Sequence, residues 1–309
     1  MSIIDAHHHV WDLAIRDQDW IAGPEMAAIR HSFTVGDLRP VAEAAGVTAT
    51  IVVQTVTVAA ETPELLALAA ADPLVAGVVG WTDLTCDAIG DQLARLTSGQ
   101  SGRFLVGIRH QVQSEPDPDW LRRPEVIRGL RAVAAAGLCY DLVVRPHQLA
   151  SASYAAAAVP DLTFVLDHAG KPPVASGAVE GWAAEIRALA RQPNTVCKLS
   201  GLVTEAAPGA PPAVFAPYAD VILNAFGPER IMFGSDWPVC LLASDYASVI
   251  RLAQSLMASL SDAERMAVFA LTAARVYGIP EPADIAGEDQ RSGGRSWLLP
   301  TRRSTRSSR

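Results

Sequence analysis

Three consecutive histidines, His7, His8 and His9, follow two isoleucines and Asp5 at the start of the chain. In a β-strand side chains alternate between two faces, so Asp5, His7 and His9 should share one face and His8 the other. Two imidazoles on one face can both reach a single divalent ion or a single substrate oxygen. An expression tag is the alternative, but a tag would not follow an apolar strand. The spacing therefore predicts a site on a first strand.

Further ionisable residues follow later apolar runs of the chain. A carboxylate such as Asp236, opposite imidazoles, can deprotonate a water while an imidazole or a cation polarises a carbonyl. Arg109 and Lys171 would supply positive charge for an anionic or strongly hydroxylated substrate. The remaining candidates for the site are His168, His110, Asp141 and His147.

These residues require a scaffold that brings distant segments together. Eight short apolar runs are typical of strands of a parallel sheet covered on both faces; they are residues 3–9, 49–54, 74–80, 104–109, 138–144, 162–168, 195–200 and 230–236. Between them lie stretches typical of helices: 35–45, 63–71, 123–136, 179–191 and 212–225. Gly46 and Gly137 stand just past two of these stretches, where a left-handed residue ends a helix.

Eight strands alternating with helices in about 280 residues indicate an α/β fold of the (β/α)8 TIM-barrel type. The alternative is a doubly wound open sheet, which would need a glycine-rich phosphate turn after a strand, and the sequence has none at the right place. A barrel gathers its chemistry at the carboxyl ends of its strands, where the ionisable residues fall. We therefore expect one barrel domain, residues 1–280, followed by a basic tail, residues 281–309, that is disordered or incidental.

Composition limits the classes of partner. The net charge of −8 argues against a nucleic-acid footprint. No apolar run reaches the roughly 20 residues that a membrane span needs, so no membrane partner is expected. The four cysteines form no CxxC pair, which favours reduced thiols in a cytoplasmic protein over a disulfide frame or a cysteine–zinc site. Homo-oligomerisation stays open.

Six segments of the chain, taken in order, resemble one known family. They are Ile4-Asp5-Ala6-His7-His8-His9-Val10-Trp11-Asp12, Gly107-Ile108-Arg109-His110, residues 140–149 (YDLVVRPHQL), Asp167-His168-Ala169-Gly170-Lys171-Pro172, Lys198-Leu199-Ser200-Gly201-Leu202 and residues 230–238 (RIMFGSDWP). The chain thereby resembles the amidohydrolase superfamily, specifically its sugar-lactonase branch, which includes L-fuconolactonases and L-rhamnonolactonases. Each motif alone is weak, but six in order are strong.

The resemblance implies a hydrolase that opens a lactone ring, with Asp236 as the base that activates water. His7, His9 and His168 would hold a metal or polarise the lactone carbonyl, and Arg109 and Lys171 would grip the substrate. No lysine ends the fourth strand, where the wider superfamily often carries a carboxylated lysine between two metals. The expected count is therefore one divalent ion or none, with His7, His9 and Asp236 as ligands and zinc as the favoured ion.

Two other functions remain open on the same barrel. One is a mononuclear zinc decarboxylase, for which His147 would have to supply a ligand from the fifth strand. The other is a barrel without catalytic activity that serves binding or assembly, which the many polar strand ends disfavour. The identity of the lactone depends on strand-end loops, notably residues 12–32 and 114–121, and the sequence leaves it undetermined.

Overall fold

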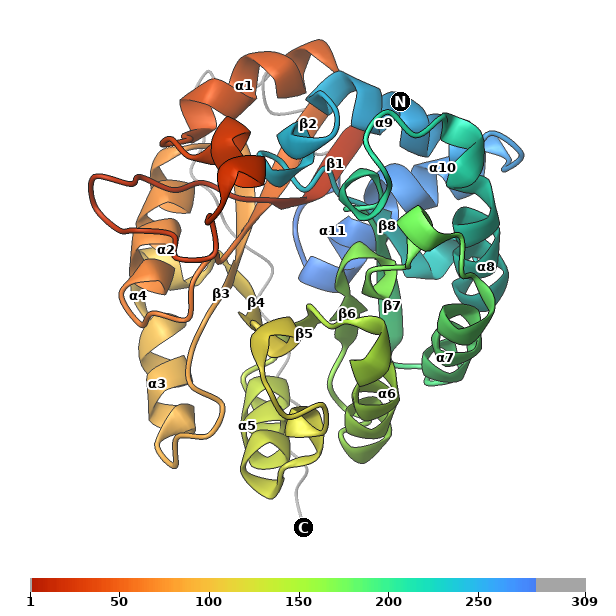
Figure 1. Ribbon diagram of the computed structural model, residues 1–309. Helices are drawn as coiled ribbons and strands as arrows, with labels where there is room; N and C mark the ends of the chain where they lie inside the picture. Colours follow the sequence, from red (N-terminus) through yellow and green to blue (C-terminus); the bar gives the residue numbers. More distant parts are fainter. Residues whose placement is uncertain (1, 282–309) are drawn as a thin grey trace.

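The computed structural model describes residues 2–281, and in them eight parallel strands pair in sequence order to form one sheet. The strands are β1 Ile3–His8, β2 Val47–Val53, β3 Val75–Gly80, β4 Leu105–His110, β5 Cys139–Leu142, β6 Phe164–Leu166, β7 Thr195–Leu199 and β8 Ile231–Phe233. The ring closes where His8 bridges Trp237, just beyond β8. Figure 1 shows the ring with helices outside it, so the predicted barrel is confirmed.

The helices of the described residues pack mainly around the outside of the ring. They are α1 Val35–Ala44, α2 Glu61–Ala71, α3 Ile89–Leu96, α4 Gly99–Gly102, α5 Pro124–Ala135, α6 Leu149–Ala158, α7 Glu180–Ala190, α8 Ala216–Phe226, α9 Tyr246–Leu256, α10 Asp262–Met266 and α11 Thr272–Tyr277. All five predicted helical stretches are confirmed, although the last begins with a separate turn, Pro212–Val214, before α8. Gly46 and Gly137 have φ values of 77° and 72°, as expected at helix ends.

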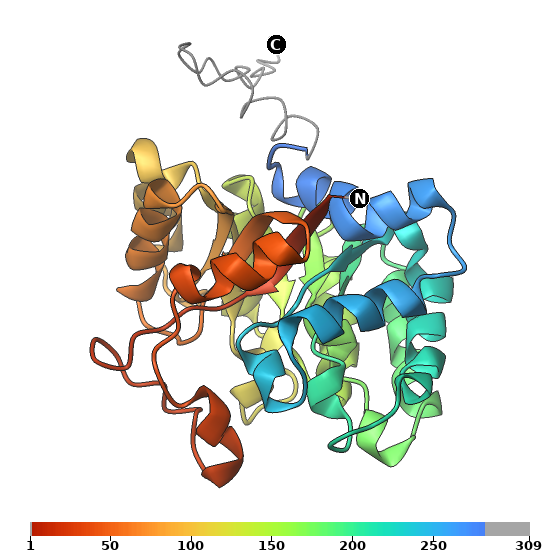
Figure 2. The same cartoon turned by 90° about the horizontal axis from the view of Figure 1, so that it is seen from above.

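Helix α11 closes one end of the barrel. Its residues Ala273, Ala274 and Tyr277 join an apolar cluster with the strand residues Ile4 and Ala49, whose side chains point into the ring. Figure 2, a view turned by 90°, shows α11 (blue) at one end of the barrel and the long loop between β1 and α1 (red-orange) extending toward the other. The carboxyl ends of the strands therefore open toward that loop, and the site is expected there.

Strands β6 and β8 are among those that end earlier than the sequence predicts, and functional residues lie in the turns that follow them. β6 ends at Leu166, and His168 just beyond it has a φ of 51°. β8 ends at Phe233, and Asp236 has a φ of 58°. A positive φ is uncommon for residues with a side chain and takes the backbone out of the pleat. In an extended strand the directions of these two side chains would follow from the alternation of faces. In the turns, the backbone conformation sets their directions instead.

Alternation also fails for Asp5 in β1. The pairing of β1 with β2 shifts register between Asp5 and His8, so that side chains on either side of the shift no longer alternate strictly. Asp5 does not join His7 and His9 as expected; it accepts hydrogen bonds from Ser235 N at 2.8 Å, Ser235 Oγ at 2.6 Å and Tyr246 Oη at 3.0 Å. Asp5 therefore joins β1 to the turn after β8 and to α9.

The described residues support one barrel unit and leave the tail untested. The predicted tail, residues 281–309, lies outside the described residues except for its first position. Within residues 2–281 no helix has both the length and the apolar character to cross a membrane. The four cysteines, all among these residues, are free thiols.

The position of Asp5 generates a stability prediction. Asp5→Ala leaves the buried Ser235 and Tyr246 donors without an acceptor, at a cost of about 2–4 kcal/mol and a fall in Tm of roughly 5–10 °C. Thermal unfolding followed by circular dichroism measures the change. Ser2→Ala, which removes a half-buried hydrogen bond between the residue before β1 and Thr48 in β2, should cost less than about 1 kcal/mol. Equal losses in the two variants would contradict a special role for Asp5.

Candidate active site

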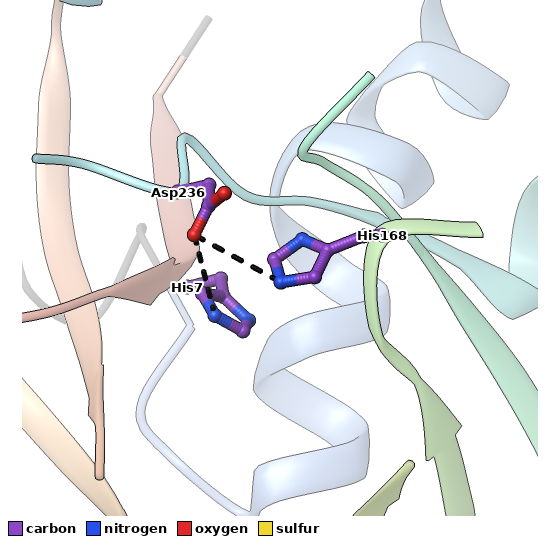
Figure 3. Close-up of side chains that lie close together, drawn as sticks. All are labelled: His7, His168 and Asp236. Carbon is purple, nitrogen blue, oxygen red and sulfur yellow. Dashed lines mark ion pairs between the residues drawn. The ribbon is translucent and has the colours of Figure 1, made fainter. Parts of the chain in front are cut away.

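Three imidazoles and one carboxylate converge at the carboxyl ends of β1, β6 and β8. Asp236 Oδ1 lies 3.7 Å from His7 Nε2, 3.5 Å from His9 Nε2 and 3.8 Å from His168 Nε2. His7 Nε2 and His9 Nε2 are 3.2 Å apart. Figure 3 shows His7, from β1, and His168, from the turn after β6, pointing toward Asp236. All four side chains are buried, with Asp236 and His168 only 4% and 5% exposed.

The second ring nitrogen of each imidazole also has a partner. His9 Nδ1 lies 2.8 Å from the Val53 carbonyl oxygen, and His168 Nδ1 lies 3.0 Å from Ser200 Oγ. His7 Nδ1 faces Asp167 Oδ1 at 3.3 Å and Lys198 Nζ at 3.2 Å. Partners at Nδ1 fix the orientation of each ring, so that every Nε2 points at Asp236.

The imidazoles control the ionisation of Asp236. Burial alone would raise the pKa of this carboxyl, but the interactions with His168, His9 and His7 outweigh burial and hold the pKa below its ordinary value. Burial lowers the pKa of His168 to about 4 against the opposing effect of Asp236. At neutral pH the site therefore holds an ionised carboxylate beside a neutral His168.

The converging atoms fit a divalent ion. The printed separations among the Nε2 and Oδ1 atoms are 3.2–3.8 Å. Ligands arranged tetrahedrally about 2.1 Å from zinc would stand about 3.4 Å apart. His7, His9 and Asp236 are the predicted ligands, and His168 forms a second group with His7 and Asp236 whose ligand atoms all lie within 4.8 Å of one another. Nitrogen and oxygen donors of this kind suit zinc among the common ions.

Sequence reasoning assigned no role to Lys198 or Asp167, which lie directly beneath His7. Both side chains are completely buried, and Lys198 Nζ lies 3.0 Å from Asp167 Oδ1. Lys198 and His7 together outweigh the burial of Asp167 and hold its pKa well below the ordinary value. One signal in the sequence marks Lys198: it and Lys171 are the only two lysines among 25 basic residues.

Two residues predicted to bind substrate are instead paired inside the barrel. Arg109 is 2% exposed; its guanidinium bonds Asp167 Oδ2 at 2.9 Å and the Gln54 carbonyl at 2.5 Å. Asp141 is completely buried and accepts from Lys198 Nζ at 2.5 Å and Tyr277 Oη at 2.9 Å. The substrate role of Asp141 stays a prediction; in this structure its carboxylate is held by these partners and has no exposed surface.

The other predicted substrate contacts lie nearer the surface. His110 is bonded by Trp81 Nε1 at 3.0 Å and contacts Glu115 Oε1 at 2.7 Å. Lys171, which follows β6, forms an ion pair with Glu205 at 3.6 Å and stays partly exposed. His147 is exposed at the turn Pro146–Gln148, outside the group of converging imidazoles. Of this set, Lys171 is a partly exposed cation in the turn that also carries His168.

Comparison with known proteins gives consistent matches along the chain. A family model described as amidohydrolase matches residues 4–279. A protein from Burkholderia multivorans named L-fucono-1,5-lactonase is 40% identical over 293 residues, which cover 91% of this chain and 97% of that protein. A protein of the same name from Burkholderia ambifaria is 39% identical over 243 residues, 79% of this chain and 82% of the relative.

A solved structure agrees with these sequence matches. The crystal structure of an amidohydrolase from Burkholderia multivorans with bound zinc matches with a TM-score of 0.85 at 38% identity. The match covers 91% of this chain and 100% of that chain. The family model and the solved structure therefore agree on an amidohydrolase.

The geometry of the imidazoles generates a metal-binding prediction. Zinc should bind with one equivalent per chain, and His9→Gln should weaken binding at least about tenfold, because it removes one ligand atom. Equilibrium dialysis followed by elemental analysis measures both quantities. His147→Gln, a matched change at an exposed histidine, should leave the affinity unaltered. If both variants bind zinc like the parent protein, the ion does not sit among these imidazoles.

Proposed function

This chain belongs to the amidohydrolase family, and on that basis we propose that it is a lactone hydrolase in which Asp236 activates the attacking water. The observation that carries the proposal is the convergence of three imidazole nitrogens on one buried, ionised carboxylate. Relatives named L-fucono-1,5-lactonase, 39–40% identical to this chain, support the choice of a lactone over other carbonyl substrates. A six-membered sugar lactone is therefore the first substrate class to test.

The reaction follows from the placement of these groups. A water held at Asp236 gives a proton to the carboxylate as its oxygen attacks the lactone carbonyl carbon. Negative charge then develops on the carbonyl oxygen, where donors from the imidazole cluster stabilise it. The ring C–O bond breaks, the proton on Asp236 passes to the leaving ring oxygen, and the product is an open-chain hydroxy acid. Asp236 ends in its starting state.

A divalent ion fits this site without replacing the role of Asp236. His7, His9 and Asp236 would hold the ion, and His168 lies close enough to His7 and Asp236 to be a further ligand. Such an ion polarises a carbonyl and lowers the pKa of water. The donor atoms present and their spacing support one ion, and zinc is the ion we propose.

Substrate recognition is proposed for residues that border the cluster. Lys171 follows His168 in the turn after β6 and can approach a hydroxyl or carboxylate of the substrate. His110, between Trp81 and Glu115, offers one wall of the mouth. Arg109 contacts His7 Nε2 at 3.3 Å and bonds Asp167, so we assign it to holding the cluster. His147 stays a predicted contact that is exposed in this structure.

The decarboxylase alternative has less support. A mononuclear zinc decarboxylase would need a metal ligand from the fifth strand. The candidate for that ligand, His147, is exposed in the turn after β5. Evolution of carbon dioxide from unsaturated acids by the purified protein would favour the decarboxylase.

A role in sugar-acid metabolism in the cytoplasm, with a small lactone as the substrate, is also part of our proposal. The free cysteines are compatible with that location.

The proposed base generates a direct test. Asp236→Asn removes the proton acceptor but keeps the shape of the side chain, so kcat for lactone opening should fall about 10³-fold. Acid release from a panel of 1,4- and 1,5-lactones, read with a pH indicator, measures the rate. Asp161→Asn, at an exposed carboxylate, should match the parent protein. Failure to open any lactone of the panel would refute the proposed function, and an unaltered rate in Asp236→Asn would refute the proposed base.

The role of Lys171 is tested by separating binding from turnover. Lys171→Met removes a cation at the mouth of the site, so KM should rise about tenfold while kcat changes less. Steady-state kinetics on the best lactone of the panel give both constants. Glu205→Gln, which removes only the ion-pair partner of Lys171, should leave KM within about threefold. A rise in KM in both variants alike would assign the effect to the loop and not to the cation.

A further inference from the structure

Lys198 presents a buried ammonium directly beneath the proposed hydrolytic site. Its side chain is completely buried in the barrel, where an ammonium group needs acceptors for all three of its hydrogens. Nζ donates to Asp141 Oδ2 at 2.5 Å and lies 3.2 Å from His7 Nδ1, and Asp167 Oδ1 stands 3.0 Å away as an ion-pair partner. One carboxylate therefore anchors the lysine by a hydrogen bond and a second by its charge, and another hydrogen of the ammonium group points at an imidazole of the site.

Each ring nitrogen of His7 has two polar neighbours, one that can donate a hydrogen bond to it and one that can accept a hydrogen bond from it. At Nδ1 the donor is Lys198 and the acceptor is Asp167 Oδ1, 3.3 Å away. At Nε2 the donor is Arg109 Nη1 at 3.3 Å, and His9 Nε2 lies 3.2 Å away. A neutral imidazole carries one hydrogen, on either nitrogen. The surroundings thus provide partners for both tautomers, and the neighbours decide which one dominates.

His9 decides the tautomer when no ion is bound. Its Nδ1 lies 2.8 Å from the Val53 carbonyl oxygen, which can only accept, so the hydrogen of His9 is on Nδ1 and its Nε2 is bare. A bare Nε2 on His7 would face that lone pair at 3.2 Å without a hydrogen between them. With the hydrogen on Nε2, His7 donates to His9 and accepts from Lys198. The Arg109 hydrogen near Nε2 opposes this form, but Nη1 lies closer to Asp167 Oδ2, at 2.9 Å.

A bound cation reverses the requirement, because a metal ligand must present a bare nitrogen. For His7 Nε2 to bind, its hydrogen has to move to Nδ1, where Asp167 accepts it and the Lys198 ammonium opposes it. We propose that Lys198 is a positioning residue that holds His7 in the tautomer with hydrogen on Nε2 and thereby weakens the affinity of the site for a divalent ion. The proposal shares its site with the proposed function, but its tests use no lactone.

A charge-balanced variant tests the effect on affinity. Lys198→Met combined with Asp141→Asn removes one cation and one anion, and leaves Asp167 paired with Arg109. Zinc affinity, measured by competition with a chromophoric chelator on the full-length protein stripped of metal, should become about tenfold tighter. Tyr277→Phe, which removes only a hydrogen bond to Asp141, should stay within about threefold of the parent protein. An unaltered or weaker affinity in the folded double variant would overturn the proposal.

Nuclear magnetic resonance of the metal-free parent protein gives a second test that requires no folded double variant. In protein labelled with ¹⁵N-histidine, the signals of His7 are those that vanish in His7→Gln. They should show the hydrogen on Nε2, and addition of zinc should move it to Nδ1. A hydrogen on Nδ1 in the metal-free protein would overturn the proposal. Neither the tautomer nor the zinc affinity depends on catalysis, so a silent lactone panel would refute the proposed function alone.

Discussion

The seam between the first and last strands is the constraint on which the site depends. Asp236 N–H donates to the His7 carbonyl at 2.8 Å, and His9 N–H donates to the Trp237 carbonyl at 2.7 Å. The residues that supply the carboxylate and two of the imidazoles are thus backbone neighbours across the seam. Asp5 reinforces the seam from beneath through Ser235. Because these segments meet only when the ring is closed, the site is a product of the whole fold.

A layer of paired charges lies between this site and the apolar interior of the barrel. It contains two cations, Lys198 and Arg109, and two anions, Asp141 and Asp167, all at most 2% exposed. A single charge buried here would cost several kcal/mol, and pairing offsets that cost only where hydrogen-bond geometry is good. Tyr277 of α11 donates to Asp141 from below, so the helix that closes the barrel also contacts the layer. The layer holds His7 from the side opposite Asp236.

Much of the fold follows from local patterns in the sequence, but the partners inside the ring do not. Short apolar runs locate all eight strands, and polar residues at their ends correctly bring His7, His9, His168 and Asp236 together. The same pattern reports only that Asp141 lies near the end of a strand; it carries no information about Lys198 and Tyr277, which face Asp141 inside the barrel. Lys198 was missed for that reason, although the rarity of lysine in this chain was visible.

The remaining geometry comes from backbone conformations that local patterns do not encode. His168 and Asp236 adopt positive φ values, which cost of order 1 kcal/mol each and persist only where the surroundings fix them. Glycines supply the space: a Cβ on Gly201 would lie 2.5 Å from His168 Nδ1, and one on Gly234 would lie 2.7 Å from His7 Cβ. His168 and His7 are therefore each held both by packing against a glycine and by a partner at Nδ1. Such double restraint keeps the Nε2 atoms directed at Asp236 without help from a substrate, which is the preorganisation that charge stabilisation in a transition state requires.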